Sequence, residues 1–381
     1  MRTWLDVEAD PGGVWRALRK SRQSPPGAAS ESFPGNIDSA TGELSPDGAA
    51  RVGTYRAALE QAEQLMKATA STGPAAQPLP LFYALSQFGR AIAAASPSLD
   101  TSTREFQLKG HGVKVTNLDS ADKDGVAKVT VTGDPRIARS PKQDGAFVKV
   151  AKALTASPMR EVRSLGQVLG WIPQSNEFSL RGREDPPEPT LTVMSFYPAD
   201  GGSQVVTIRG LPFDLLAGEP SPNNPGGVVP RRFEPDDQRV ADTLDGYPSL
   251  RGWAWLDSTI PARVNLNGLG SWDANVCFPA SVGQSAVRDH STLYRGELFA
   301  FPSVKDDLAV HPFLAWWQVL ISLSMLARYQ PNEWFTLIDV DRHEDAVPIE
   351  SMLTFCQNAL PDLALRAIED ASGAVSMPKS F

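Results

Sequence analysis

The sequence predicts an α+β fold, with helical segments at the N- and C-terminal ends packed around a β-rich middle. Apolar residues recur at helical spacing within residues 51–95 and again after Pro312. Between these regions, short runs of β-branched residues alternate with polar residues and are interrupted by glycines and an Asp-Gly pair. Strands and helices therefore occupy separate parts of the chain, an order typical of α+β proteins.

The length of 381 residues exceeds that of a typical single domain. We expect residues 1–50 to form an N-terminal extension with a Pro-, Gly- and Ser-rich loop, and residues 51–185 to form a lobe of helices and strands. Residues 190–310 are expected to form a β-rich lobe that contains long loops. Residues 311–381 are expected to form a helical C-terminal segment that packs on the core.

The N-terminal half contains two predicted helices after an irregular segment. Residues 21–50 are interrupted by Pro-Gly pairs and an Asp-Gly pair, so we expect little regular structure and weak packing there. A helix is predicted over residues 51–70 and a second over 80–95. The buried stripe of the first helix would be Val52, Tyr55, Leu59, Ala62 and Met66.

Short strands are predicted within residues 103–132, and a helical pattern returns at about 144–170. Residues 191–196 and 205–208 are typical of two paired strands around a turn at Gly201-Gly202. A further short strand is predicted at residues 263–266.

The segment 311–334 predicts one deeply buried helix. His311 precedes Pro312, a residue favoured in the first turn of a helix. The uncharged run 313–327 is shorter than the roughly 18–20 residues that a bilayer span requires, so we expect a core helix and no membrane association. Trp316 and Trp317 are expected in the core rather than on a stacking surface.

Charge and cysteine usage restrict the setting of the protein. The net charge of −8 disfavours broad capture of nucleic acid or anionic lipid, although a local basic groove stays open. Cys277 and Cys356 lie far apart and form no CxxC pair, which argues against a disulfide framework. The N-terminus turns acidic without an apolar run. We therefore expect a cytoplasmic protein.

The helix at 80–95 carries the candidate ligand-binding residues. Leu81, Leu85, Phe88 and Ile92 form its apolar stripe, and the other side presents Tyr83, Ser86, Gln87 and Arg90. A phenol, a hydroxyl, an amide and a guanidinium suit directional hydrogen bonds, and Arg90 suits a phosphate or carboxylate. These residues predict either a pocket for an anion or polar ligand, or an interior polar seam that pairs with neighbouring backbone.

His111 is the candidate catalytic residue, because glycines on both sides let the backbone approach closely and expose the imidazole. A structural histidine in a turn is the alternative. Arg104 precedes it at a spacing loosely similar to that of HEPN-type ribonucleases, which place the pair on a helix. Residues 105–109 alternate like a strand and Gly110 breaks the pattern, so this resemblance is poor.

No metal site and no cofactor are expected. The acidic run 339–345 lacks the glycine of a calcium loop and predicts a solvated turn. Arg231-Arg232 is too short to form a basic patch. The chain has no GxxxxGK[ST], GxGxxG after a strand, GxSxG or HExxH motif, which disfavours the corresponding enzyme classes.

Two segments resemble the YaaC-like family of bacterial proteins: residues 79–92 followed by Gly110-His111-Gly112, and residues 311–334 with their core Leu323-Ser324-Met325-Leu326-Ala327-Arg328-Tyr329. The resemblance spans about residues 50–370 and implies one shared fold and bacterial, cytosolic residence, without a defined activity.

Two functions remain open at this point. The first is a binding or assembly component that docks a protein partner. The alternative is an enzyme acting on a phosphate-bearing ligand, nucleotide or nucleic acid, with Arg90 holding the anion, His111 as acid or base, and Tyr83 and Gln87 orienting the substrate. The sequence leaves the oligomeric state open.

Overall fold

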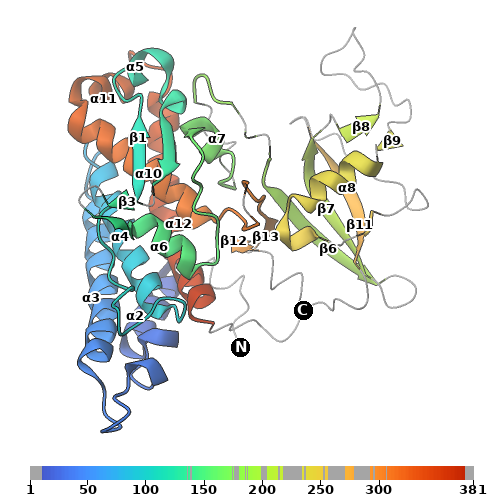
Figure 1. Ribbon diagram of the computed structural model, residues 1–381. Coiled ribbons are helices and arrows are strands. Elements are labelled where there is room, and N and C mark those ends of the chain that lie inside the picture. The colour runs from blue at the N-terminus through green and yellow to red at the C-terminus, as the bar shows by residue number, and fades with distance from the viewer. Residues whose placement is uncertain are drawn as a thin grey trace. The chain divides into compact units, whose positions relative to one another are not determined.

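A computed structural model describes residues 11–134, 136–137, 140–173, 175, 180–184, 186, 188–198, 204–212, 215–217, 234–235, 237–251, 254–255, 271–278, 292–294, 297–305 and 307–373. The chain divides into two compact units (Figure 1). Residues 1–186 and 310–381 form unit 1, and residues 187–309 form unit 2. The helices lie mainly in unit 1 and the larger sheet in unit 2, which confirms the predicted α+β fold.

Unit 1 is built around helix α4, Pro78–Ala95, which packs against α3, Pro46–Thr69, and against the C-terminal helices α10 and α12 (Figure 1). The predicted stripes on both helices are buried, including Val52 and Tyr55 on α3 and Leu85 and Phe88 on α4. Ser45 starts α3, because its hydroxyl accepts a hydrogen bond from Gly48 N at 3.0 Å.

Helix α10, Pro312–Tyr329, is buried on all sides over its first four turns, as the sequence predicts. The Nδ1 atom of His311 accepts a hydrogen bond from Phe313 N at 3.1 Å and so caps the helix. Burial lowers the pKa of His311 to about 4, so the ring is neutral. The helix ends before Pro331, where α11, Pro331–Leu337, begins, so segment 311–334 forms two helices rather than one.

The remaining parts of unit 1 are short. Helix α2 covers Pro11–Gln23, and α12 covers Ala346–Ser372. Strands β1, Val113–Thr116, β2, Thr130–Gly133, and β5, Arg163–Ser164, form an antiparallel sheet in the order β1-β2-β5. The other short elements are α5 (Ala121–Asp124), α6 (Ala146–Ala153), α7 (Leu165–Leu169), β3 (Arg136–Ile137), β4 (Ser140–Asp144) and the 3-10 turns η1 (Gly27–Ala29), η2 (Pro34–Asn36) and η3 (Val126–Lys128).

Unit 2 contains a six-stranded antiparallel sheet in the order β10-β11-β7-β6-β13-β12. Its strands are β6 (Leu191–Pro198), β7 (Gln204–Pro212), β10 (Ala254–Trp255), β11 (Ser271–Phe278), β12 (Thr292–Tyr294) and β13 (Glu297–Ala300). The predicted pairing of 191–196 with 205–208 is confirmed, with Val193 opposite Ile208, whereas Gly201-Gly202 and residues 263–266 lie outside the described residues.

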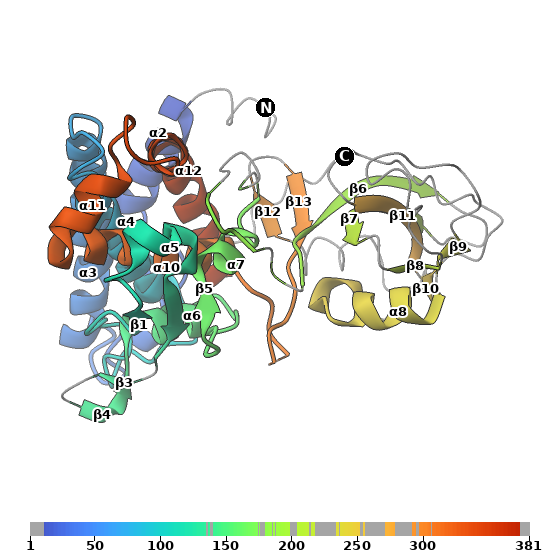
Figure 2. The ribbon, with the colours of Figure 1, turned by 90° about the horizontal axis from the view of Figure 1, so that it is seen from above.

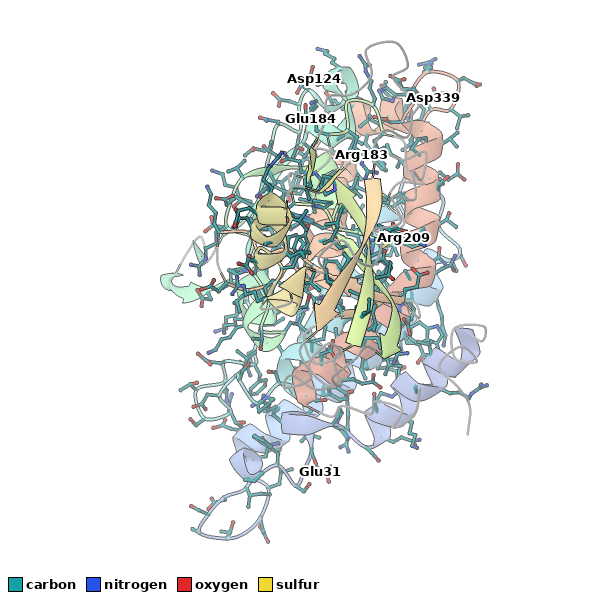
Figure 3. The ribbon with its side chains drawn as sticks, turned by 90° about the vertical axis from the view of Figure 1, so that its right-hand side faces the viewer. Glu31, Asp124, Arg183, Glu184, Arg209 and Asp339 are labelled. Atoms are coloured by element: carbon teal, nitrogen blue, oxygen red, sulfur yellow. The ribbon has the colours of Figure 1, made fainter. Side chains whose placement is uncertain are left out.

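Helix α8, Asp237–Asp245, lies along one face of this sheet (Figure 2). Val240 and Leu244 pack with strand residues such as Val206 and Ile208 to form the core of the unit. On the other side of β7, Arg209 donates from Nε to Asp273 Oδ2 at 3.2 Å (Figure 3). The short strands β8 (Leu216–Ala217) and β9 (Glu234–Pro235) pair with each other, and η7 covers Pro248–Leu250.

Three local expectations are wrong. Residues 105–109 form turns and no strand, because the chain here wraps around buried Phe106 and Leu108 without a partner strand. The helical pattern at 144–170 is split into α6 and α7, with the buried residues Ala156 and Met159 in irregular chain between them. Segment 21–50 is not weakly packed throughout, since Ala28, Ala29 and Asn36 are fully buried, although residues 38–44 are exposed as expected of a surface loop.

Candidate anion-binding site

The polar face of α4 is partly open to solvent. Tyr83 is 41% exposed, and Ser86, Gln87 and Arg90 are half-buried. Nη1 of Arg90 donates to Ser86 Oγ at 3.4 Å, a long hydrogen bond along the helix surface. Partial burial lowers the pKa of Arg90, which nevertheless stays protonated. The four predicted ligand-binding residues therefore share one accessible helix face rather than an interior seam.

His111 is held beside this face by the glycines that flank it. Gly110 and Gly112 adopt φ angles of 64° and 73°, which side-chain-bearing residues rarely adopt. A Cβ atom at Gly112 would meet Phe147 N at 2.8 Å, so glycine is also required by close backbone approach. The exposed imidazole meets the Phe82 ring edge-on, with 5.3 Å between ring centres. Phe82 belongs to α4, so this contact fixes His111 against the helix.

Helix α10 supplies a second arginine to the same place. Trp334 lies just after α10, and Ala75 lies just before α4. The Nε1 atom of Trp334 donates a hydrogen bond to the carbonyl oxygen of Ala75 at 2.9 Å. The end of α10 therefore lies beside the start of α4. Arg328 is exposed near this end, and its guanidinium lies 5.0 Å above the ring of Tyr329.

The positive charges of Arg90 and Arg328 both act on the imidazole of His111. The pKa of His111 is lowered first by the protein atoms that displace water from the ring, and then by the positive charges of Arg328 and Arg90. Both guanidiniums therefore lie close enough to act on the imidazole. The arrangement leaves His111 neutral near pH 7 and places two fixed positive charges around it.

Neither guanidinium is neutralised by a carboxylate of the described residues. Other arginines of unit 1 pair with acids, as in Arg19 with Glu63 and Arg104 with Asp47, each at 2.6 Å. Among the described residues, Arg90 contacts the Ser86 hydroxyl as its one polar partner, and Arg328 lies over the ring of Tyr329. A cluster of cations without counter-charge favours binding of an anion. We call Tyr83, Ser86, Arg90, His111 and Arg328 the α4–α10 site.

Gln87 and Arg104 stand apart from this group. Gln87 is on the α4 face, but it makes no hydrogen bond with any described residue. Arg104 adopts a positive φ of 54° in a turn and pairs with Asp47 at the start of α3, so it is not presented with His111 from a helix in the manner of HEPN-type ribonucleases. Sequence reasoning did not include Arg328 among the candidate site residues, because it lies near the end of the helix predicted within 311–334.

Other candidate residues have structural roles. Trp316 and Trp317 are fully buried. Within the run 339–345, Asp345 is fully buried and accepts hydrogen bonds from Arg181 N at 2.6 Å and Val126 N at 3.3 Å, so this part of the predicted solvated turn is interior. Arg231-Arg232 lies outside the described residues.

Two further properties concern the described residues only. No group of three His, Cys, Asp or Glu side chains among them is arranged to hold a metal ion. No helix that they form is both long and apolar enough to cross a membrane.

Comparison with curated proteins and with solved structures finds no match. Comparison with family models finds a match over two segments, which together contain every residue of the α4–α10 site. The stretch between them, 200–262, holds β7 and α8 of unit 2. Because residues 39–199 and 263–368 match the YaaC-like protein family, the chain belongs to this family.

Proposed function

We propose that this protein binds a phosphate-bearing ligand at the α4–α10 site. The observation that carries the proposal is that Arg90 on α4 and Arg328, near the end of α10 that lies beside the start of α4, have no carboxylate partner among the described residues. A guanidinium offers paired N–H donors that match the oxygens of a phosphate. Because α4 and α10 are packed helices, the backbone positions that carry the two arginines are fixed before the ligand arrives.

The buried free thiol of Cys356 supports a cytoplasmic setting for this function. An enzymatic step is the natural extension of binding, because the neutral imidazole of His111 is the form that accepts a proton. Turnover of a bound phosphate ester by the unsubstituted protein, and its loss in the His111→Ala variant, would establish this enzymatic step.

Docking of a protein partner is a second candidate function. Three large apolar side chains are exposed on α11, α12 and the turn between them: Phe335 at 63%, Val340 at 61% and Val347 at 60%. A pull-down partner that is lost when all three are changed to serine would support this function.

The test of phosphate binding uses thermal unfolding of the full chain with inorganic phosphate and pyrophosphate. A ligand at 100 times its Kd stabilises the folded state by about 2.7 kcal/mol, a shift of several degrees in Tm. Arg90→Ala and Arg328→Ala should each remove most of this shift while leaving the unliganded Tm nearly unchanged. Arg90→Lys should recover only part, because an ammonium lacks the paired donors.

The matched control is Arg342→Ala. Arg342 is also an exposed arginine of unit 1, but it pairs with Asp339 at 3.2 Å, and such surface pairs contribute about 0–1 kcal/mol. This variant should respond to phosphate like the unchanged protein. The absence of a thermal shift with phosphate in the unsubstituted protein would refute a specific site. So would a loss of the shift in Arg342→Ala equal to the loss in Arg90→Ala and Arg328→Ala.

A further inference from the structure

An exposed aromatic ring lies on the same face of α4 as Arg90. Tyr83 is 41% exposed, and its hydroxyl makes no hydrogen bond with any described residue. Its ring contacts Phe82 with 5.9 Å between centres, and Phe82 in turn contacts His111. The Tyr83 ring is therefore supported by Phe82 and remains accessible to solvent.

Helix geometry aligns Tyr83 with Arg90. The two residues are seven positions apart, which places them within about 20° of each other around α4. The Arg90 side chain turns back along the helix, because its guanidinium reaches Ser86. Ser86 lies less than one turn, about 5 Å, from Tyr83 along the axis. The positive charge and the open ring are therefore neighbours.

Tyr329 has a different role, although it is 58% exposed. The guanidinium of Arg328 already lies over its ring at 5.0 Å. Tyr329 therefore positions Arg328, and Tyr83 is the ring that is left for a ligand. An aromatic ring beside phosphate-binding arginines is the combination that recognises nucleotides, whose bases stack on aromatic side chains whatever their sequence.

We infer that the ligand of the α4–α10 site is a mononucleotide, with its phosphate between Arg90 and Arg328 and its base stacked on Tyr83. This inference rests on the proposed function. Two guanidinium charges balance one terminal phosphate, which carries about −1.5 to −2 at pH 7. The net charge of −8 opposes a long nucleic acid, whose remaining phosphates would be repelled. A single nucleotide avoids this repulsion.

The experiment compares four ligands by calorimetry on the full chain: inorganic phosphate, ribose 5-phosphate, adenosine 5′-monophosphate and a phosphoserine peptide. The nucleotide should bind about tenfold more tightly than ribose 5-phosphate, which corresponds to about 1.4 kcal/mol. Tyr83→Ala should remove this tenfold preference, so that adenosine 5′-monophosphate and ribose 5-phosphate bind with equal affinity. Tyr83→Phe should keep the preference, because it retains the ring.

Each other outcome has a defined meaning. Equal affinity for the nucleotide and ribose 5-phosphate overturns the nucleotide assignment but leaves phosphate binding in place. So does a preference that survives in Tyr83→Ala, or tighter binding of the phosphoserine peptide. Absence of binding by all four ligands overturns the proposed function itself, and the nucleotide assignment with it.

Discussion

Arg51 and Arg90 use the same side chain in opposite settings. Arg51 is 1% exposed and donates to the carbonyl oxygens of Ala94, Ser96 and Leu99, which follow the last turn of α4 or lie within it. Its Nη1 also donates to Thr101 Oγ1 at 2.7 Å. Burial lowers the pKa of Arg51 to about 10, so it stays charged and must keep these acceptors. Arg90, by contrast, is half-buried, and among the described residues its guanidinium donates only to Ser86 Oγ.

The Arg51→Ala substitution should therefore lower the stability of the folded protein. It leaves buried carbonyls without donors, and we expect a loss of about 3–5 kcal/mol in the free energy of unfolding by urea. Arg51→Lys should recover little, because an ammonium cannot reach the same set of acceptors. The control is Arg56→Ala on the same helix, whose exposed pair with Glu31 should contribute under about 1 kcal/mol (Figure 3 labels Glu31). A loss of less than about 1 kcal/mol in the free energy of unfolding of Arg51→Ala would contradict the role of Arg51 as donor to the carbonyl oxygens at the end of α4.

His111 predicts a pH dependence of anion binding. Its folded pKa lies below the ordinary 6.5 because of lost water and the charges of Arg328 and Arg90. Without ligand, the unfolded chain takes up the proton first, so stability falls as pH drops through 6.5 toward the folded pKa. A bound anion offsets the arginine charges and raises the pKa of His111, so binding takes up a proton and strengthens at lower pH.

Sulfate is the appropriate probe, since its charge is constant between pH 8 and pH 5.5. The thermal shift that sulfate produces should grow over this range, and His111→Gln should abolish the growth while keeping a shift at pH 8. A shift that is independent of pH in the unchanged protein would remove His111 from the site.

At the scale of elements, the close contact of α4 with α10 positions the arginines. Gly89 allows it, because a Cβ at this position would meet Trp317 Cζ3 and would lie 2.9 Å from Trp317 Cη2. The Trp317 ring also meets Phe82, Phe147 and Phe313 edge-on, with centres 6.2–6.3 Å apart. The helices are therefore locked together within about two turns of Tyr83 on α4 and about three turns from Arg328 on α10.

Gly89→Ala tests this contact against helix propensity. Alanine is favoured over glycine in a helix by about 1 kcal/mol, but the clash with Trp317 should reverse the sign and cost about 1–3 kcal/mol. The control is Gly53→Ala on α3, where no atom lies within 4 Å of the added Cβ and the change should stabilise the protein. Trp317→Ala alone should cost about 3–5 kcal/mol. In that background Gly89→Ala should become neutral or stabilising, and an unchanged penalty would contradict the contact.

The sequence predicted these elements well because their signals are local. The spacing of Leu81, Leu85 and Phe88 indicates the buried face of α4, and His311-Pro312 indicates the start of α10. The polar face of α4 was equally visible. Local sequence signals do not show that Arg328 lies near this face, because its position depends on how α10 packs against α4. The strand predicted from the alternation at residues 105–109 is wrong for the same reason, because a strand forms only when it can pair with another strand.

At the scale of the whole molecule, unit 1 is assembled from two distant stretches of chain. Tyr83, Arg90 and His111 come from the part before residue 187, and Arg328 comes from the part after residue 309. Both parts also contain the residues that match the YaaC-like family. The α4–α10 site therefore requires residues 310–381 to pack against residues 1–186, although the whole of unit 2 separates them in the sequence.

The N-terminal segment belongs to this assembly as well. Asn36 donates from Nδ2 to Ala28 O at 2.9 Å and to Ser30 O at 2.7 Å, and its Oδ1 accepts from Thr101 Oγ1 at 3.2 Å. A Cβ at Gly27 would lie 2.6 Å from Ala95 O and from Ser372 Cβ, so this turn contacts the ends of α4 and α12. Proline and glycine exclude a long helix here, but they do not exclude packing, which is why composition alone underestimated the segment.

Limited proteolysis should separate the two halves of this segment. Residues 38–44 are exposed and should be cut first, whereas 27–36 should resist because their backbone is held by Asn36 and by neighbouring helices. Asn36→Ala leaves buried carbonyls without donors, so it should lower the free energy of unfolding by about 1–3 kcal/mol and open 27–36 to cleavage. Mass spectrometry of the earliest fragments measures both effects. First cleavage inside 27–36 in the unchanged protein would mean that this turn is not held by α4 and α12, and that the contacts around Asn36 are too weak to order the chain.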